Sequence, residues 1–285
     1  MKTVEITYRY DDEDRGARAR PGDAVEARAR LDAGCRDFAR LLDSLGEGDG
    51  VASRVIRVDP RDLGLDHGDG AAPRQRPFAA VLGCSDARVP VELIFNEGPN
   101  DLFVVRVAGN GLGAEGLGSL KYAADHLAGS LRLVVVLAHS GCGAVTAAVD
   151  LFLQPRNYLA LATRHALREM LDRLLLVVHA SASRLEAAFG PDVASRAGYR
   201  EALIEASVVS NAALAAHTVE QELGDAGGLR AAYGVYLIGS REVWAPRADG
   251  DECAGLAWPP RDAAGFGDFA SAVVRSARVR AMLEP

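Results

Sequence analysis

The stretch LRLVVVLAHSGCGAVTAAVDLFL, residues 131–153, decides the fold of this chain. It begins with a nearly continuous apolar run, residues 131–138, which is typical of a strand buried on both faces. A glycine-containing turn follows, and residues 142–153 then predict a helix. A buried strand that leads directly into a helix indicates an α/β protein with a parallel sheet.

Other segments of the chain repeat this order of strand and helix. The fold expected is an open, mainly parallel central sheet flanked by helices, with an N-terminal helical arm. Short apolar runs predict further strands at 78–83, 102–109 and 233–239. Helical spacing of apolar residues predicts helices at 24–45, 116–129, 161–189 and 198–223.

The chain of 285 residues is long enough for one large α/β domain, which we assign to residues 24–285. Residues 1–23 include a charged stretch broken by proline and glycine, so we expect a mobile N-terminal arm there. Residues 59–77 are rich in glycine, proline and aspartate and predict a loop. The sequence leaves the placement of the helical segment 155–200 open.

Composition narrows the class of protein. The formal net charge of -7 argues against nucleic acid as the main partner. The apolar runs are shorter than the roughly 20 residues that a membrane-spanning helix needs, and the N-terminus has no signal-like apolar region. Four scattered cysteines are too few for a disulfide framework. We therefore expect a cytoplasmic protein that contacts neither nucleic acid nor membrane.

Soft metal ligands stand where two of the predicted strands end. Cys84 follows the strand at 78–83, His139 follows the strand at 131–138, and Cys142 lies at the start of the next helix. Ligands of open parallel sheets bind beyond the carboxyl ends of the strands. A lone cysteine there is usually a small buried hydrophobe, but two thiols and an imidazole at one edge favour Zn²⁺ with an open fourth position.

A carboxylate and a guanidinium follow the first cysteine closely. Asp86 is two residues beyond Cys84, so it can reach the metal or a water bound to it. Arg88 can hold that carboxylate through two parallel hydrogen bonds. Elsewhere we would interpret such a pair as an ordinary surface ion pair, but next to metal ligands it indicates a catalytic pair.

These motifs give the chain a family resemblance. The segments CSDAR at 84–88 and HSGC at 139–142 resemble the β-class carbonic anhydrases, of the plant-like and bacterial branch. The similarity continues through 101–110, 119–123, 211–224 and 233–243.

The resemblance implies a zinc-dependent lyase that hydrates carbon dioxide reversibly to bicarbonate and a proton by a zinc-bound hydroxide. It also implies a dimer or higher homo-oligomer, because several pocket residues of the family come from the neighbouring subunit. The resemblance assigns Cys84, His139 and Cys142 as zinc ligands, Asp86 and Arg88 as the catalytic pair, Gln75, Phe103 and Tyr122 as substrate-binding residues, and Tyr122 and His126 as proton-transfer residues.

Other functions stay open at this point. Carbonyl sulfide and carbon disulfide hydrolases use similar zinc sites on the same fold. The segment GLGAEG at 111–116 matches a dinucleotide-binding pattern, although a single match is weak evidence. A zinc site without catalysis is a further alternative, but Asp86 and Arg88 argue against it. Whether Asp86 binds the ion at low pH is also left open.

Overall fold

The computed structural model describes residues 2–10, 19–41, 50–64, 72–161, 164–223, 228–246 and 252–284. Its strands are β1 Lys2–Tyr10, β2 Gly50–Val58, β3 Ala79–Gly83, β4 Leu102–Arg106, β5 Leu133–His139, β6 Arg230–Tyr236, β7 Val243–Pro246 and β8 Glu252–Ala254. Its α-helices are α1 Ala24–Arg40, α2 Val91–Phe95, α3 Ala114–His126, α4 Gly143–Leu153, α5 Tyr158–Leu161, α6 His165–Phe189, α7 Tyr199–Leu223, α8 Ala263–Arg275 and α9 Ala277–Leu283. Short 3₁₀ turns are η2 Pro60–Leu63, η3 Ala108–Asn110, η4 Pro155–Asn157 and η5 Pro191–Ser195.

The central sheet has the order β4-β3-β5-β6-β7-β8 among the residues described. Strands β4, β3, β5 and β6 are parallel, and β7 and β8 are antiparallel additions at one end. Gly83 at the end of β3 is level with Leu137 of β5, so the residues that follow β3 and β5 reach the same edge of the sheet. The mainly parallel α/β sheet predicted from the sequence is therefore confirmed.

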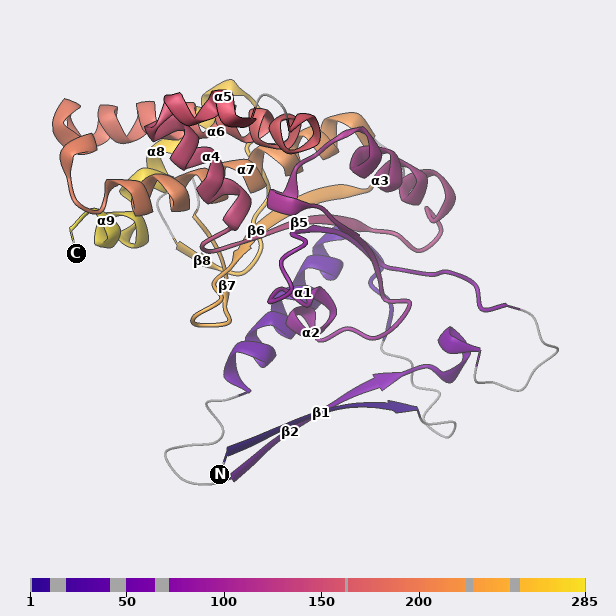
Figure 1. The fold of residues 1–285 in the computed structure, drawn as a ribbon. Helices are drawn as coiled ribbons and strands as arrows, with labels where there is room; N and C mark the ends of the chain where they lie inside the picture. Colours follow the sequence, from indigo (N-terminus) through magenta and orange to yellow (C-terminus); the bar gives the residue numbers. More distant parts are fainter. Residues whose placement is uncertain are drawn as a thin grey trace.

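Helices cover both faces of this sheet (Figure 1). In β3, Ala80 and Leu82 belong to the core under α3, α4, α6 and α7, whereas Ala79 and Val81 belong to the core under α1 and α2. This alternation places every side chain of β3 in a core, which explains its continuous apolar sequence.

The N-terminal helix packs on the sheet of its own chain. Its side chains Leu31 and Cys35 are buried in the core under α1 and α2. The helix begins at Asp23, whose carboxylate accepts hydrogen bonds from the backbone of Val25 and Glu26 at 2.8 Å. It is described to Arg40, so the predicted continuation to residue 45 lies outside the described residues.

The long helix α7 is the main core helix. By length and hydropathy alone it is the one helix of the described residues that could cross a membrane, but 72% of its most apolar window is buried inside the fold. It contacts α6, which occupies most of the segment 155–200 that the sequence left unplaced.

A second, two-stranded sheet lies apart from the central one (Figure 1). Strand β1 pairs in parallel with β2 over nine residues each, from Lys2 opposite Gly50 to Tyr10 opposite Val58. The sequence interpretation placed residues 2–10 within an N-terminal arm and did not identify either strand. The signal was present as alternation of apolar and polar residues in both segments.

Candidate metal centre

The carboxyl ends of β3 and β5 bring three metal-ligand side chains together. Cys84 directly follows β3, His139 is the last residue of β5, and Cys142 is the N-cap of α4. One donor atom from each lies within 4.8 Å of the others, and the two Sγ atoms are 4.0 Å apart. A tetrahedral zinc ion with Zn–S bonds of about 2.3 Å would hold two sulfurs about 3.8 Å apart. The donor types and their spacing therefore fit a metal ion.

The imidazole of His139 is oriented for metal binding. Its Nδ1 atom lies 3.1 Å from the carbonyl oxygen of Ser140, and a carbonyl only accepts, so Nδ1 carries the proton. Its Nε2 atom is buried and has no hydrogen-bond partner among the described residues. Buried polar atoms rarely lack a partner. A lone pair left free in this way is what a metal ion would occupy.

The two thiols influence each other strongly. The hydrogen bond with Cys142 lowers the pKa of Cys84, and the same contact raises the pKa of Cys142. Burial opposes the charged imidazole of His139, but the neighbouring Cys84 sulfur, the Ser140 carbonyl and the Asp86 carboxylate together raise the pKa of His139. Binding of a metal ion to these three side chains would therefore release protons from them.

Asp86 and Arg88 form the pair expected from the sequence. The Arg88 guanidinium donates from Nε to Oδ1 at 3.0 Å and from Nη2 to Oδ2 at 2.7 Å, and the Arg88 backbone N–H donates to Oδ1 at 2.9 Å. These hydrogen bonds hold the pKa of Asp86 well below its usual range. Its Oδ2 atom is 3.7 Å from Nε2 of His139, so an ionised carboxylate faces the three donors.

Two polar residues that the sequence analysis did not single out support the loop that carries Cys84. The Arg106 guanidinium donates to the carbonyl oxygens of Cys84 and Asp86 at 3.0 and 2.5 Å. The Asn110 amide donates to the carbonyl oxygens of Leu82 and Leu137 at 3.0 and 2.7 Å, so it joins the ends of β3 and β5. Both residues lie in the segment 101–110 that carries the resemblance, but their partners lie in β3, in the loop after β3 and in β5.

Gly109 lies beside the metal-ligand group, at a position that has no space for a side chain. Its N–H donates to Sγ of Cys84 at 3.4 Å, and its φ of +67° is in the left-handed region. A Cβ atom at this position would lie 2.9 Å from Cβ of Ala144 and 3.2 Å from a methyl carbon of Leu174. Glycine is therefore required by both backbone conformation and space.

Replacing Gly109 by alanine is expected to lower the free energy of unfolding by about 2 to 4 kcal/mol, since left-handed strain and overpacking add. Urea unfolding of the protein measures this change. The matched control is Gly118→Ala in α3, where an added Cβ meets nothing within 4 Å. Alanine favours helix there by up to about 1 kcal/mol. Equal stability of the two variants would contradict the requirement at position 109.

Two of the three predicted substrate-binding residues, Gln75 and Phe103, lie towards the opposite end of the sheet. Phe103 is level with Ala80 near the start of β3, and Gln75 precedes that strand. The five residues of β3 span about 16 Å, and Cys84 comes after them. The structure therefore does not bring Gln75 or Phe103 to the metal-ligand group of the same chain.

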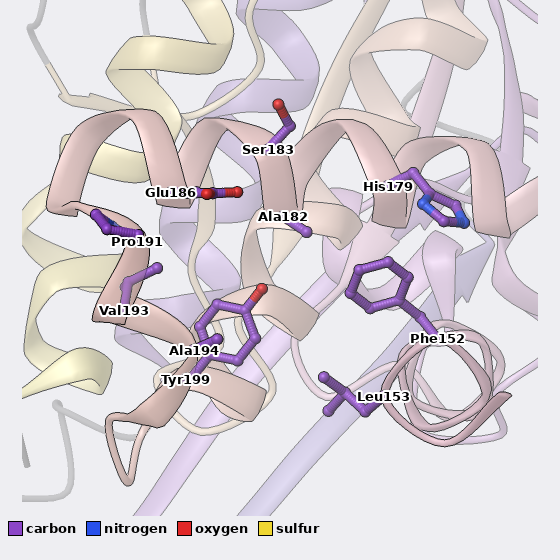
Figure 2. Close-up of a pocket in the computed structure, with 10 residues that line it drawn as sticks. All are labelled: Phe152, Leu153, His179, Ala182, Ser183, Glu186, Pro191, Val193, Ala194 and Tyr199. Atoms are coloured by element: carbon purple, nitrogen blue, oxygen red, sulfur yellow. The ribbon is translucent and has the colours of Figure 1, made fainter.

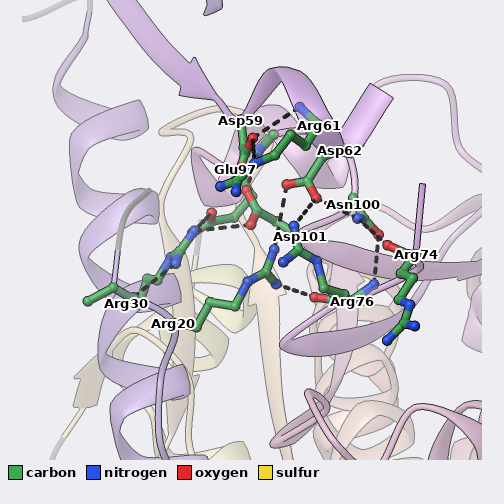
Figure 3. Close-up of polar contacts among 12 residues, drawn as sticks. Arg20, Arg30, Asp59, Arg61, Asp62, Arg74, Arg76, Glu97, Asn100 and Asp101 are labelled. Atoms are coloured by element: carbon green, nitrogen blue, oxygen red, sulfur yellow. Dashed lines mark hydrogen bonds and ion pairs between the residues drawn. The ribbon is translucent and has the colours of Figure 1, made fainter. Parts of the chain in front are cut away.

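The backbone around Gln75 is held by one asparagine (Figure 3). The Asn100 amide group donates to the carbonyl oxygen of Arg74 at 2.9 Å and to Oδ1 of Asp62 at 2.8 Å. Its side-chain oxygen accepts from the backbone N–H of Arg76 at 2.9 Å. Asn100 adopts a φ of 66°, so it maintains a left-handed conformation while it fixes both neighbours of Gln75.

Tyr122 and His126 lie on the exposed side of α3. Their rings stack with centroids 4.4 Å apart, and Nδ1 of His126 is 3.1 Å from the carbonyl oxygen of Tyr122. Tyr122 is 51% exposed. The two side chains are therefore in contact with each other and accessible from outside the chain.

A separate cavity of about 380 Å³ lies between α4, α6 and α7 (Figure 2). Phe152, His179, Glu186 and Tyr199 are among its lining residues. Phe152 and Leu153 in the last turn of α4 line it, whereas Cys142 caps the first turn, and the 11 residues of this helix span about 16 Å. The cavity is thus distinct from the metal-ligand group.

Comparison with known proteins identifies one family. The family model described as carbonic anhydrase matches residues 79–242, which include the metal-ligand group and the Asp86–Arg88 pair. This match favours neither the dinucleotide interpretation of residues 111–116 nor the sulfide hydrolase alternative.

Two curated carbonic anhydrases are similar to part of this chain. The chain is 47% identical to carbonic anhydrase 2 of Mycobacterium tuberculosis over 85 residues, which is 30% of this chain and 40% of that relative. It is 43% identical to a carbonic anhydrase of Pseudomonas aeruginosa over 82 residues, or 27% and 36% of the two chains. The chain thus spans less than half the length of these curated relatives.

The solved structure of the β-carbonic anhydrase CcaA is similar to this chain with a TM-score of 0.47 and 26% sequence identity. The matched part covers 64% of this chain and 85% of CcaA.

Proposed function

The chain belongs to the carbonic anhydrase family, since the family model covers more than half of its residues, and we propose on this premise that it hydrates carbon dioxide reversibly to bicarbonate and a proton. It is then a lyase of the carbonate dehydratase type. The observation that carries the proposal is the buried group of Cys84, His139 and Cys142 with the ionised carboxylate of Asp86 beside it.

We propose zinc as the metal ion, held by the two sulfurs and by Nε2 of His139. Two thiolates and one imidazole leave a fourth position open, which is the arrangement of catalytic zinc sites. When bound, zinc supplies a Lewis acid that lowers the pKa of a coordinated water to about 7. The protein contributes the orientation of its ligands through the Ser140 carbonyl and the Gly109 N–H.

Asp86 and Arg88 prepare the attacking water for reaction. Arg88 keeps the carboxylate ionised near neutral pH by donating hydrogen bonds to both of its oxygens. The carboxylate can then accept a hydrogen bond from the water and direct the water's lone pair towards the carbon of the substrate. Arg106 fixes the backbone carbonyls of Cys84 and Asp86, so the metal ligand and the carboxylate keep their relative positions.

We propose that a second copy of the chain completes the substrate pocket. Gln75 and Phe103 lie towards the opposite end of the sheet from Cys84 of their own chain, and the family resemblance assigns them, with Tyr122, to substrate binding. In a homodimer these residues would serve the partner's metal centre. Gln75 would donate a hydrogen bond to a substrate oxygen, and Tyr122 and His126 would transfer the proton to buffer.

Stopped-flow measurement of carbon dioxide hydration, with metal content determined on the same sample, tests this function. We expect about one zinc ion per chain and a rate of hydration that rises in proportion to zinc content. Protein that contains zinc but does not accelerate hydration would contradict the proposed reaction. A chain that binds no zinc would contradict the proposed metal centre.

Asn100 provides a test of the role of Gln75. Asn100→Gly removes the hydrogen bonds to Arg74 and Arg76 but tolerates the positive φ. We expect KM for carbon dioxide to rise about 3- to 10-fold, as for the loss of roughly one hydrogen bond, with kcat nearly unchanged. Steady-state kinetics of the purified variant measures both constants.

The control repeats the substitution in a Gln75→Ala background. If Asn100 acts through Gln75, the second substitution adds no further change in KM, because the two effects are coupled. Independent, multiplying effects would show that Asn100 has only a general structural role.

A further inference from the structure

Strand β1 has an apolar face that its own chain covers only in part. The parallel register places Val4, Tyr8 and Tyr10 of β1 on the same face as Ala52, Ile56 and Val58 of β2. The three β2 residues are at most 7% exposed, whereas the three β1 residues are 37–41% exposed. The apolar face that β2 buries against the rest of the protein therefore continues onto β1, where its side chains are partly exposed.

The outer edge of β1 is also open. β1 pairs with β2 on one side, and no other described strand pairs with it on the other. Figure 1 shows this two-stranded sheet lying away from the central sheet. From Thr3 to Tyr10, no other described strand pairs with the outer backbone N–H and C=O groups of β1, and such an edge is a template for a further strand. A sheet of only two strands gains stability when more strands are added.

We propose that β1 pairs antiparallel with β1 of a second copy of this chain, about a two-fold axis through Thr7. The result is one four-stranded sheet with the order β2-β1-β1-β2 across the two copies. Such a contact is isologous, since each copy offers the same strand to the other. The inference does not depend on the proposed function.

The charges of β1 select both the partner and the register. Glu5 and Arg9 are exposed on the face opposite to Tyr8. Within the part of the chain that the structure describes, neither side chain forms a hydrogen bond or an ion pair. With Thr7 on the axis, Glu5 of each copy lies opposite Arg9 of the other, so two complementary charge pairs form. The strand is therefore complementary to itself.

Neighbouring registers lose this complementarity. An axis through Ile6 places Glu5 opposite Thr7, and an axis through Glu5 places two carboxylates opposite each other, which is unfavourable. On the apolar face, the axis through Thr7 also places Ile6 opposite Tyr8 and Val4 opposite Tyr10. Pairs of β-branched and aromatic side chains stabilise antiparallel sheets. The charge pairs thus select the register through Thr7, and the apolar pairs are compatible with it.

Charge reversal tests the pairing. We expect Arg9→Glu or Glu5→Arg to weaken the self-association of the full chain at least about 10-fold, because like charges then face each other. The double variant Glu5→Arg/Arg9→Glu should restore it. Sedimentation velocity over a range of protein concentrations measures the association, and circular dichroism checks that each variant is folded. Identical assembly of wild type and Arg9→Glu at every concentration would overturn the proposal.

A cysteine at the axis tests the register separately. In Thr7→Cys the two new side chains would lie on opposed residues with Cα atoms about 4.5 to 5.5 Å apart, within the range of a disulfide. We expect mild oxidation to cross-link this variant into covalent dimers. In the control Thr3→Cys the same register separates the two residues by about 27 Å, and no additional cross-link over wild type is expected. Equal cross-linking of the two variants would overturn the register.

Discussion

Replacing Cys142 by alanine is expected to reduce carbon dioxide hydration at least about 1000-fold and to remove most of the bound zinc. The substitution leaves one sulfur and one imidazole where three donors now lie within 4.8 Å of one another. Metal activation of water contributes several kcal/mol to such reactions, which corresponds to about this factor. Stopped-flow kinetics and metal analysis of the same preparation measure both effects.

Cys35 is the matched control for this experiment. It is also a buried free cysteine, but it lies in α1 in the core under α1 and α2. Cys35→Ala should cost some stability through a small cavity while zinc content and rate stay near those of the wild type. A fully active, zinc-replete Cys142→Ala variant would remove the basis of the proposed metal centre.

Replacing Asp86 by asparagine is expected to lower kcat/KM about 100-fold, within the range attributed to a positioned proton acceptor, while zinc content stays unchanged. Asparagine is nearly the same size, but it lacks the charge that Arg88 now stabilises through both carboxylate oxygens. Arg88→Ala should have a similar effect, and the double variant should be little worse than either single one, because the residues act as a pair.

A similar ion pair elsewhere on the surface provides the control. Arg200 holds Asp150 in α4 through contacts of 2.7 and 2.9 Å, the same two-point geometry as the Asp86–Arg88 pair. Asp150→Asn should leave both rate and zinc content unaltered. If Asp86→Asn retained full kcat/KM, Asp86 would have no part in orienting the water.

The sequence predicted the central strands within a few residues. Continuous apolar runs identify β3 and β5, because strands buried on both faces carry apolar side chains at every position. The same reasoning missed β1 and β2. Their alternating pattern is compatible with a strand that has one covered face, but it does not identify the strand that pairs with it. That pairing partner lies more than 40 residues away in the sequence.

The candidate metal-ligand group was also predictable, but its supporting residues were not. Ligand types and their positions at strand ends placed Cys84, His139 and Cys142 at one edge of a parallel sheet, and the structure brings them together. Asn110 shows the limit of this reasoning. An asparagine after a glycine indicates a turn, but its hydrogen bonds to Leu82 and Leu137 depend on two strands meeting in space.

The sequence by itself thus determined the α/β class, the strand ends and the ligand types, since hydrophobic periodicity and side-chain chemistry are local properties of the chain. Only the tertiary structure decided that Gln75 and Phe103 lie towards the opposite end of the sheet from the metal-ligand group of their own chain, and that β1 keeps an open edge. The reason is physical: strand pairing and register join segments distant in sequence, and the energy of those contacts depends on both segments at once.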